Sequence, residues 1–245
     1  IRGIFNFVIS MKEGYRCLMK SDEKQMDDEE TPEDEKLSDK AMNIIMTVAM
    51  ILGIVLAVGL FVFLPKWLVN FSDTLTENRY LRSLSEGIIK IVIFIAYLGC
   101  TALMKDLRRT YEYHGAEHKT IACLEAGLEL TIDNVKKQRR FHPRCGTSFL
   151  FITLIISILV MCLVPFTIVW QRVIASIILI PVMVGISYEL IRIAGRYDNI
   201  LTKIISAPGL YIQRLTTKEP DEKQIEVAIE AIKPCIPENP EEDRW

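Results

Sequence analysis

The stretch that decides the fold is AMNIIMTVAMILGIVLAVGLFVFL, residues 41–64, which contains no charged side chain in 24 residues. The hydrocarbon core of a bilayer is about 30 Å thick and is crossed by roughly 20 helical residues. Residues 41–64 are therefore predicted to form a transmembrane helix. Hydrophobic residues make up 50% of the 245-residue chain, a share that argues against a soluble enzyme, a secreted disulfide scaffold or a nucleic-acid-binding domain.

Three further apolar stretches lie along the chain. Residues 88–104 are interrupted only by Lys90, residues 146–171 contain no charge, and residues 173–188 are uncharged but short. We expect Lys90 and Arg172 to extend their charged ends out of the bilayer, a behaviour called snorkelling, and the fourth helix to continue through Glu189 to residue 191. The sequence thus predicts an all-α integral membrane protein with four transmembrane helices, amphipathic surface helices and a small cytosolic helical layer.

The distribution of basic residues predicts the orientation of these helices. Of the 29 Lys and Arg residues, 24 lie in residues 1–40, 103–147 and 190–245, whereas the two remaining connections hold four. Because basic loops stay in the cytoplasm, we expect a multi-pass protein with both ends and the middle loop cytoplasmic. In that reducing compartment the six cysteines are expected to form no disulfides. A net charge of −2 gives no reason to expect a nucleic-acid partner.

The predicted segments differ in composition. Residues 1–20 mix apolar and charged side chains, as in an amphipathic helix on a membrane surface, and residues 21–40 form an acidic stretch expected to be a flexible linker. In the C-terminal segment Pro208-Gly209 predicts a turn, and Pro234 the end of a short helix. The remaining segments are a first transmembrane pair with its outer loop (41–104), a cytosolic histidine loop (105–147), a second transmembrane pair (148–194) and cytosolic C-terminal amphipathic and soluble helices (195–245).

All three histidines lie in the loop of residues 105–147. Residues 112–126 are good helix formers and Gly127 is a stop signal, so His114 and His118 are predicted to lie one turn apart on one helix face. A histidine pair at i and i+4 suits zinc or a similar divalent transition metal. With Glu117 the pair also matches His-x-x-Glu-His, the pattern of zinc enzymes in which the glutamate serves as general base.

His142 and Cys145, at the entrance to the third apolar stretch, are candidates for completing this site. Two histidines with a third histidine and a thiolate would form a closed, structural tetrahedral site. A carboxylate as third ligand would instead leave one coordination position open for catalysis. Glu189 is the candidate carboxylate, because an acidic residue at the end of a membrane helix is a functional candidate. The third ligand is thus Glu189 or His142, with Cys145 as the remaining option.

Each of these residues also has a simpler explanation that involves no metal. The histidines of the pair would line a polar helix face and hydrogen-bond to nearby glutamates or a loop. Glu189 would only pair with Arg192. The basic residues 136–140 would face anionic lipid headgroups rather than nucleic acid.

Several short strings together resemble the YqhQ family of bacterial membrane proteins. The likeness covers essentially the whole chain. It implies that the protein lies in the bacterial cell membrane. The family has been described as predicted metal-dependent enzymes, and its reaction is unassigned. Members of that family usually begin with a soluble, Gly-rich segment before the region of Arg2-Gly3, so we expect this sequence to be a piece of a longer protein. The strings are HGAEHK (114–119), HPRCGTSF (142–149), Tyr188-Glu189, Pro208-Gly209-Leu210, Thr216-Thr217 and Glu226-Val227-Ala228.

These observations favour a metal-binding membrane protein that acts as a metal-dependent hydrolase at the cytosolic face, with Glu117 as base. The alternative is a homo-oligomeric channel or transport assembly in which a structural metal or the histidine cluster is a clamp and no bond is broken. A third hypothesis is a scaffold that recruits cytosolic partners through the acidic linker. Four helices with few internal charges offer no ion path within one subunit, so a pore would need several copies. The expected partners are membrane lipid and further copies of the chain.

Overall fold

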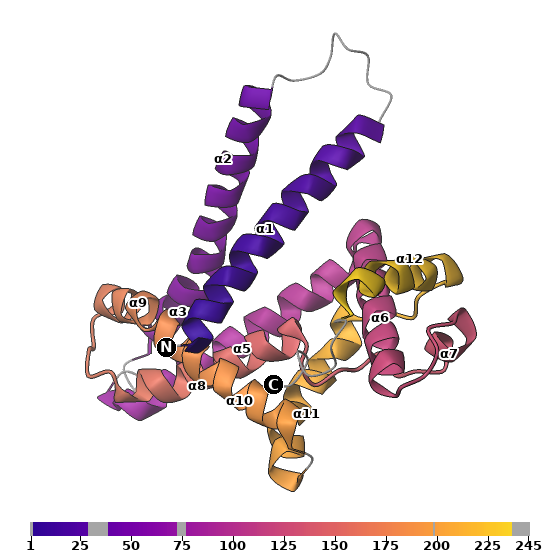
Figure 1. Cartoon of the computed structure of the whole chain (residues 1–245). Coiled ribbons are helices and arrows are strands. Elements are labelled where there is room, and N and C mark those ends of the chain that lie inside the picture. The colour runs from indigo at the N-terminus through magenta and orange to yellow at the C-terminus, as the bar shows by residue number, and fades with distance from the viewer. Residues whose placement is uncertain (1, 29–38, 73–76, 198, 237–245) are drawn as a thin grey trace. The chain divides into compact units, whose positions relative to one another are not determined.

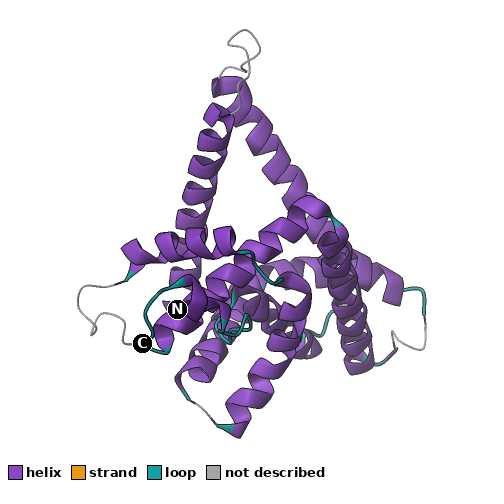
Figure 2. Cartoon of the chain, turned by 90° about the vertical axis from the view of Figure 1, so that its right-hand side faces the viewer, coloured by secondary structure: helices purple, strands orange, loops and turns teal. Residues whose placement is uncertain are grey.

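The computed structural model describes residues 2–28, 39–72, 77–197 and 199–236. Within these ranges the regular elements are helices joined by short loops, and no strand is present (Figure 2). The chain divides into two compact units, residues 1–86 with 160–185 and residues 87–159 with 186–245. The division falls within three helices, α5 (Arg79–Leu103), α8 (Gly146–Leu163) and α10 (Ile180–Arg196). The predicted all-helical class is confirmed for the described residues.

The first unit contains the longest apolar helical stretch. Helix α2 (Asp39–Val58) continues through a π-helical turn, η2 (Gly59–Phe63), into α3 (Leu64–Val69) (Figure 1). Residues Ile44–Val69 are long and apolar enough to cross a membrane, and 0% of their most apolar window is buried within the chain. An apolar surface of this size calls for a cover of lipid or of another apolar surface.

Among the described residues, three helices are long and apolar enough to cross a membrane, and the count is four if one bent pair is a single span. The bent pair consists of α9 (Val169–Ile178) and α10, which meet at 50°. One straight fourth helix was expected, and the difference has a local cause. Pro181 follows the break at Leu179, lacks a backbone N–H and clashes with the carbonyl one turn earlier. The third helix likewise ends at Leu163, two residues before Pro165.

Both cations that were expected to snorkel are buried instead. In the first unit Arg172 is 0% exposed, and its Nη2 lies 2.9 Å from Oγ of Ser83 while its Nε lies 2.9 Å from Oε1 of Glu86. In the second unit Nζ of Lys90 donates to Oγ of Ser157 at 3.1 Å. The snorkelling prediction was wrong for both: inside the fold the Glu86 carboxylate pairs with Arg172, and the Ser157 hydroxyl accepts a hydrogen bond from Lys90.

The N-terminal helix is longer than predicted. Helix α1 (Arg2–Asp28) includes residues 21–28, which were expected to begin the flexible linker. The good helix formers Glu23, Lys24, Gln25 and Met26 make up the middle of that extension. The rest of the expected linker, residues 29–38, lies outside the described residues.

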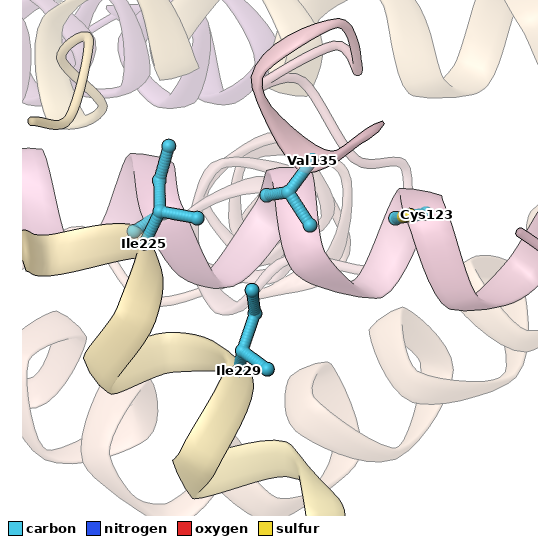
Figure 3. Packing of buried hydrophobic residues seen from close by; sticks show 5 residues of the cluster. Cys123, Val135, Ile225 and Ile229 are labelled. Carbon is cyan, nitrogen blue, oxygen red and sulfur yellow. The ribbon is translucent and has the colours of Figure 1, made fainter. Parts of the chain in front are cut away.

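In the second unit three helices form a small layer around a shared core. Helix α12 (Glu222–Ile232) packs against α6 (Lys105–Glu125) and α7 (Ile132–Lys136). Figure 3 shows Ile225 and Ile229 of α12 on the side that faces the other two helices. The core they form contains Cys123 of α6 and Val135 of α7, both 0% exposed. This layer holds the histidine-bearing helix in place.

The predictions of where helices end near the site are confirmed in part. Gly127 stops α6 with φ of +66°, a conformation that glycine adopts without strain. A short 3-10 turn, η3 (Lys233–Cys235), ends α12 at Pro234 as predicted. Helix α11 (Ile200–Thr216), however, continues through Pro208, where a turn was expected. The next residue, Gly209, lies so close to Ser148 that an added Cβ would be 2.6 Å from its Cβ, so the helix packs tightly against α8 directly after the proline.

Candidate metal centre

His114 and His118 lie on α6 on the side that faces the rest of the second unit. Their rings are adjacent, with centroids 4.4 Å apart. His118 is 3% exposed and His114 is half-buried. Ala116 and Cys123 lie on the opposite face of α6 and pack into the α12 layer, whereas the histidine face is covered by the residues before α8 and by the end of α11. The predicted histidine pair is therefore present and turned inward.

Cys145 joins the pair from the residue just before α8. Its Sγ lies 3.3 Å from Nε2 of His114, and the ligand atoms of His114, His118 and Cys145 all lie within 4.8 Å of one another. The thiol is 6% exposed, and all six cysteines of the chain are free. Three side chains that can ligate a metal thus converge from two segments of the chain about 30 residues apart in sequence.

The outer nitrogens of both rings are held by backbone carbonyl groups. Nδ1 of His114 lies 2.8 Å from the carbonyl oxygen of Thr216, and Nδ1 of His118 lies 2.6 Å from that of Arg140. A carbonyl oxygen only accepts, so in each neutral ring the proton sits on Nδ1 and Nε2 keeps its lone pair. Metal-binding histidines are oriented in this way, with the second nitrogen donating to a carbonyl or carboxylate.

The Cys145 thiol is acidified by this arrangement. Burial alone would raise its pKa, but hydrogen bonds from His114 and His118 and the positive charge of those rings, both present when the rings are protonated, lower the pKa to about 5. For His114 burial works to lower the pKa, whereas its hydrogen bond with Cys145 and the thiolate charge raise it. The thiol is therefore a thiolate at neutral pH, which is the form that binds metals and attacks electrophiles.

His142 lies beside the group and is not a member of it. Its ring centroid is 5.9 Å from that of His118. Its Nε2 faces the carboxylate of Glu125 at 3.2 Å, and its Nδ1 accepts the backbone N–H of Arg144 at 3.3 Å. Burial lowers its pKa and outweighs the opposing effect of Glu125. Because both ring nitrogens have protein partners, His142 supports the neighbouring loop in this arrangement.

Glu117 and Glu189 also lie outside the three-residue group. The Glu117 side chain is exposed on α6 one residue before His118, and Glu189 lies on α10, partly buried. Of the six residues named from the sequence, the structure brings together His114, His118 and Cys145.

Sequence reasoning missed the groups that position these ligands. Gln213 is 0% exposed and bridges two segments: its Nε2 donates to the carbonyl of His142 at 2.7 Å and to Oγ of Ser148 at 2.8 Å. Its Oε1 accepts the backbone N–H of His142 at 2.8 Å. The available signal was a glutamine next to the apolar residues Tyr211 and Ile212, since a buried amide requires partners. The carbonyls of Thr216 and Arg140 could not be identified from the sequence, because every residue has a backbone carbonyl.

The three side chains fit a zinc-type ion by chemistry and by spacing. Imidazole nitrogen and thiolate sulfur are both good zinc ligands. A tetrahedral ion about 2.0 Å from nitrogen and about 2.3 Å from sulfur would hold those two atoms roughly 3.6 Å apart. The 3.3 Å between Cys145 Sγ and His114 Nε2 is close to this value, so only small side-chain shifts are needed.

Comparison with known proteins places the chain among relatives without an assigned activity. Residues 1–238 match a family described as "Protein of unknown function (DUF1385)". The chain is similar to the uncharacterized protein YqhQ of Bacillus subtilis (strain 168), with 33% identity over 238 residues that cover 95% of this chain and 75% of that protein. No solved structure is significantly similar to the chain.

Proposed function

Taking as a premise that this chain belongs to the DUF1385 family, we propose that it is an integral membrane protein with a zinc-type centre at His114, His118 and Cys145. The centre lies at the cytosolic face and serves a hydrolytic reaction. The membrane assignment is supported by three to four helices of spanning length and composition. It is further supported by the exposed apolar side chains of α2, among them Ile54, Val55 and Leu56, which are 58–69% exposed. The charge asymmetry of the loops supports the cytosolic orientation.

One observation carries the metal assignment. Nε2 of His114 lies 3.3 Å from the Cys145 sulfur, the ligand atoms of His114, His118 and Cys145 lie within 4.8 Å of one another, and Nδ1 of each ring is bound to a backbone carbonyl. Histidines that merely line a polar helix face would need neither the shared thiolate nor the matched orientation. The alternative explanation of an ordinary polar face is therefore less consistent with the geometry than a metal site.

The ligand set favours catalysis over a purely structural role. Structural zinc sites are closed by four protein ligands, whereas catalytic sites have three. Here three side chains converge, and the fourth residue expected for a closed site, His142, has both ring nitrogens engaged. A zinc ion held by three protein ligands supplies Lewis acidity at its remaining position. The base predicted from the sequence, Glu117, has an exposed carboxylate near the site, and its role as a base stays a prediction.

A second candidate function rests on the Cys145–His114 pair itself. A buried thiolate within 3.3 Å of an imidazole is the arrangement of a cysteine nucleophile and its partner base. The N–H of Thr147, at the start of α8, also points at the sulfur at 3.4 Å. In this hypothesis the thiolate attacks an acyl carbon and His114 returns the proton to the leaving group. The oligomeric channel stays a prediction from the sequence.

Metal analysis of the purified chain decides between these functions. We expect about one zinc per chain after expression with zinc present. His114→Ala, His118→Ala and Cys145→Ser should each lose most of it, while His142→Gln and the exposed-cysteine control Cys235→Ser should keep it. If the wild-type chain and all variants contain equal metal, the zinc proposal is overturned.

Alkylation of Cys145 by iodoacetamide provides the second readout. A thiolate bound to zinc is protected and becomes reactive after chelation, whereas a free nucleophilic thiolate reacts at neutral pH with or without chelator. Labelling of Cys145 that is equally fast before and after chelation, in the chain as purified, would favour the cysteine hydrolase.

A further inference from the structure

A cationic pocket opens beside His142 in the second unit. Its volume is about 710 Å³. The walls come from residues 139–144, from the end of α10 and from one face of α11. Among the described lining residues the charged side chains are five cations, Arg139, Arg144, Arg196, Lys203 and Arg214, and one carboxylate, Glu125.

The single carboxylate is already compensated. Glu125 binds the side chain of Arg144 and accepts from Nε2 of His142 at 3.2 Å. Three of the cations are arginines that remain exposed, namely Arg139, Arg196 and Arg214. Arginine binds phosphate through two parallel N–H donors, which makes it the typical phosphate ligand of proteins. The pocket therefore carries a positive charge that an anion can neutralise.

Helix α11 also presents an apolar face next to the pocket. Ile200, Ile204 and Tyr211 are 79%, 64% and 67% exposed and lie within about 40° of one another on the helix. Lys203 and Arg214, which line the pocket, lie on the adjoining face. An exposed apolar face beside a basic face is the pattern of a helix at the level of lipid headgroups.

We propose that this pocket binds the phosphate group of an anionic ligand and that this ligand is the substrate of the neighbouring centre. The binding site stands on the pocket alone, whereas its assignment as a substrate site rests on the proposed function. The phosphate belongs to a lipid headgroup at the membrane surface or to a soluble phosphate compound, and both offer the same oxygens to the arginines.

The test compares pocket and non-pocket cations in the full chain. Phosphatidylcholine nanodiscs with and without phosphatidic acid measure retention of the lipid phosphate, and equilibrium dialysis with radioactive inorganic phosphate measures the soluble source. Arg139→Gln and Arg214→Gln should each weaken binding about tenfold, because each removes a charged hydrogen-bonding group. The control variants Lys137→Gln and Lys223→Gln, exposed cations outside the pocket, should bind as the wild type does. Burial of Cys123, measured by alkylation, shows that each variant is folded.

The results separate the two proposals. Selective retention of phosphatidic acid identifies the lipid, and binding of inorganic phosphate alone identifies a soluble ligand. Equal binding by pocket and control variants, or no selectivity for either probe, overturns the phosphate site even if zinc is present. His114→Ala should keep phosphate binding while it loses zinc. If the wild type binds phosphate but contains no zinc, the metal proposal fails and the pocket assignment survives.

Discussion

Replacement of Gly115 by alanine tests how the fold supports the candidate centre. In the middle of a helix this change normally stabilises by about 1 kcal/mol, since alanine is the better helix former. At Gly115, however, the added Cβ would lie 2.0 Å from the backbone carbonyl oxygen of Lys218, whereas ordinary contact begins at 3.4 Å. The segment that joins α11 to α12 must therefore move by about 1.4 Å.

The hydrogen bonds made by that segment determine how much stability the substitution costs. The N–H of Lys218 donates to the carbonyl of Tyr111 at 2.8 Å, and two residues earlier the carbonyl of Thr216 holds His114. Overpacking costs about 1–3 kcal/mol, and a lost backbone hydrogen bond adds about 1 kcal/mol. With the gain in helix propensity subtracted, we expect Gly115→Ala to destabilise the α6–α12 layer by about 2 kcal/mol.

The buried thiol of Cys123 reports this loss directly. It is 0% exposed, so alkylation requires the layer to open. A change of about 2 kcal/mol should make labelling roughly 30-fold faster, measured as modified Cys123 peptide against time on detergent-purified chain. The matched control is Gly14→Ala in α1, where an added Cβ meets nothing within 4 Å, and labelling should stay at the wild-type rate. Wild-type protection of Cys123 in Gly115→Ala would refute the close-approach argument.

Three further outcomes are expected. Glu86→Gln should lower the free energy of unfolding by about 3–5 kcal/mol, since it leaves the buried guanidinium groups of Arg82 and Arg172 without their shared carboxylate; unchanged melting would contradict the buried ion pairs. The pKa of Glu219 is lowered because Lys119 and Arg140 outweigh its partial burial, so the stabilisation by this carboxylate is fully present at neutral pH. The gap in melting temperature between wild type and Glu219→Gln should begin to narrow below about pH 4.3 and close once the pH is below the lowered pKa; a gap that does not narrow in acid would exclude this linkage. In a membrane-impermeant labelling assay on intact cells, Phe71→Cys should react and Lys137→Cys should not; the reverse would invert the topology.

The helical class could be predicted from the sequence because it depends on local patterns. Uncharged stretches of more than 20 residues and a helix-former run ended by Gly127 carry their own structural signal. The positions of charges within the fold could not be predicted in this way. Whether Arg172 points to water or to Glu86 depends on a partner 86 residues away, and no local pattern encodes that pairing.

The candidate site could also be predicted only where it depends on local geometry. The i, i+4 spacing placed His114 and His118 on one face, since it follows from helix geometry alone. The choice of third ligand among Cys145, His142 and Glu189 depended on tertiary packing. His142 and Cys145 are three residues apart in a non-helical turn, and only the backbone path of that turn decides which of the two points to the pair.

Helix α11 connects the two sites of the second unit. Gln213 fixes it to the residues before α8, and Gly209 lets it approach Ser148 closely. Its last residue, Thr216, provides the carbonyl that orients His114, while another face of the same helix lines the cationic pocket. A rigid helix cannot shift one of these faces without the other, so a ligand that moves α11 also moves the group that holds the His114 proton on Nδ1. The buried amide of Gln213 makes three hydrogen bonds and has no exposure, so it fixes this helix to His142 and Ser148.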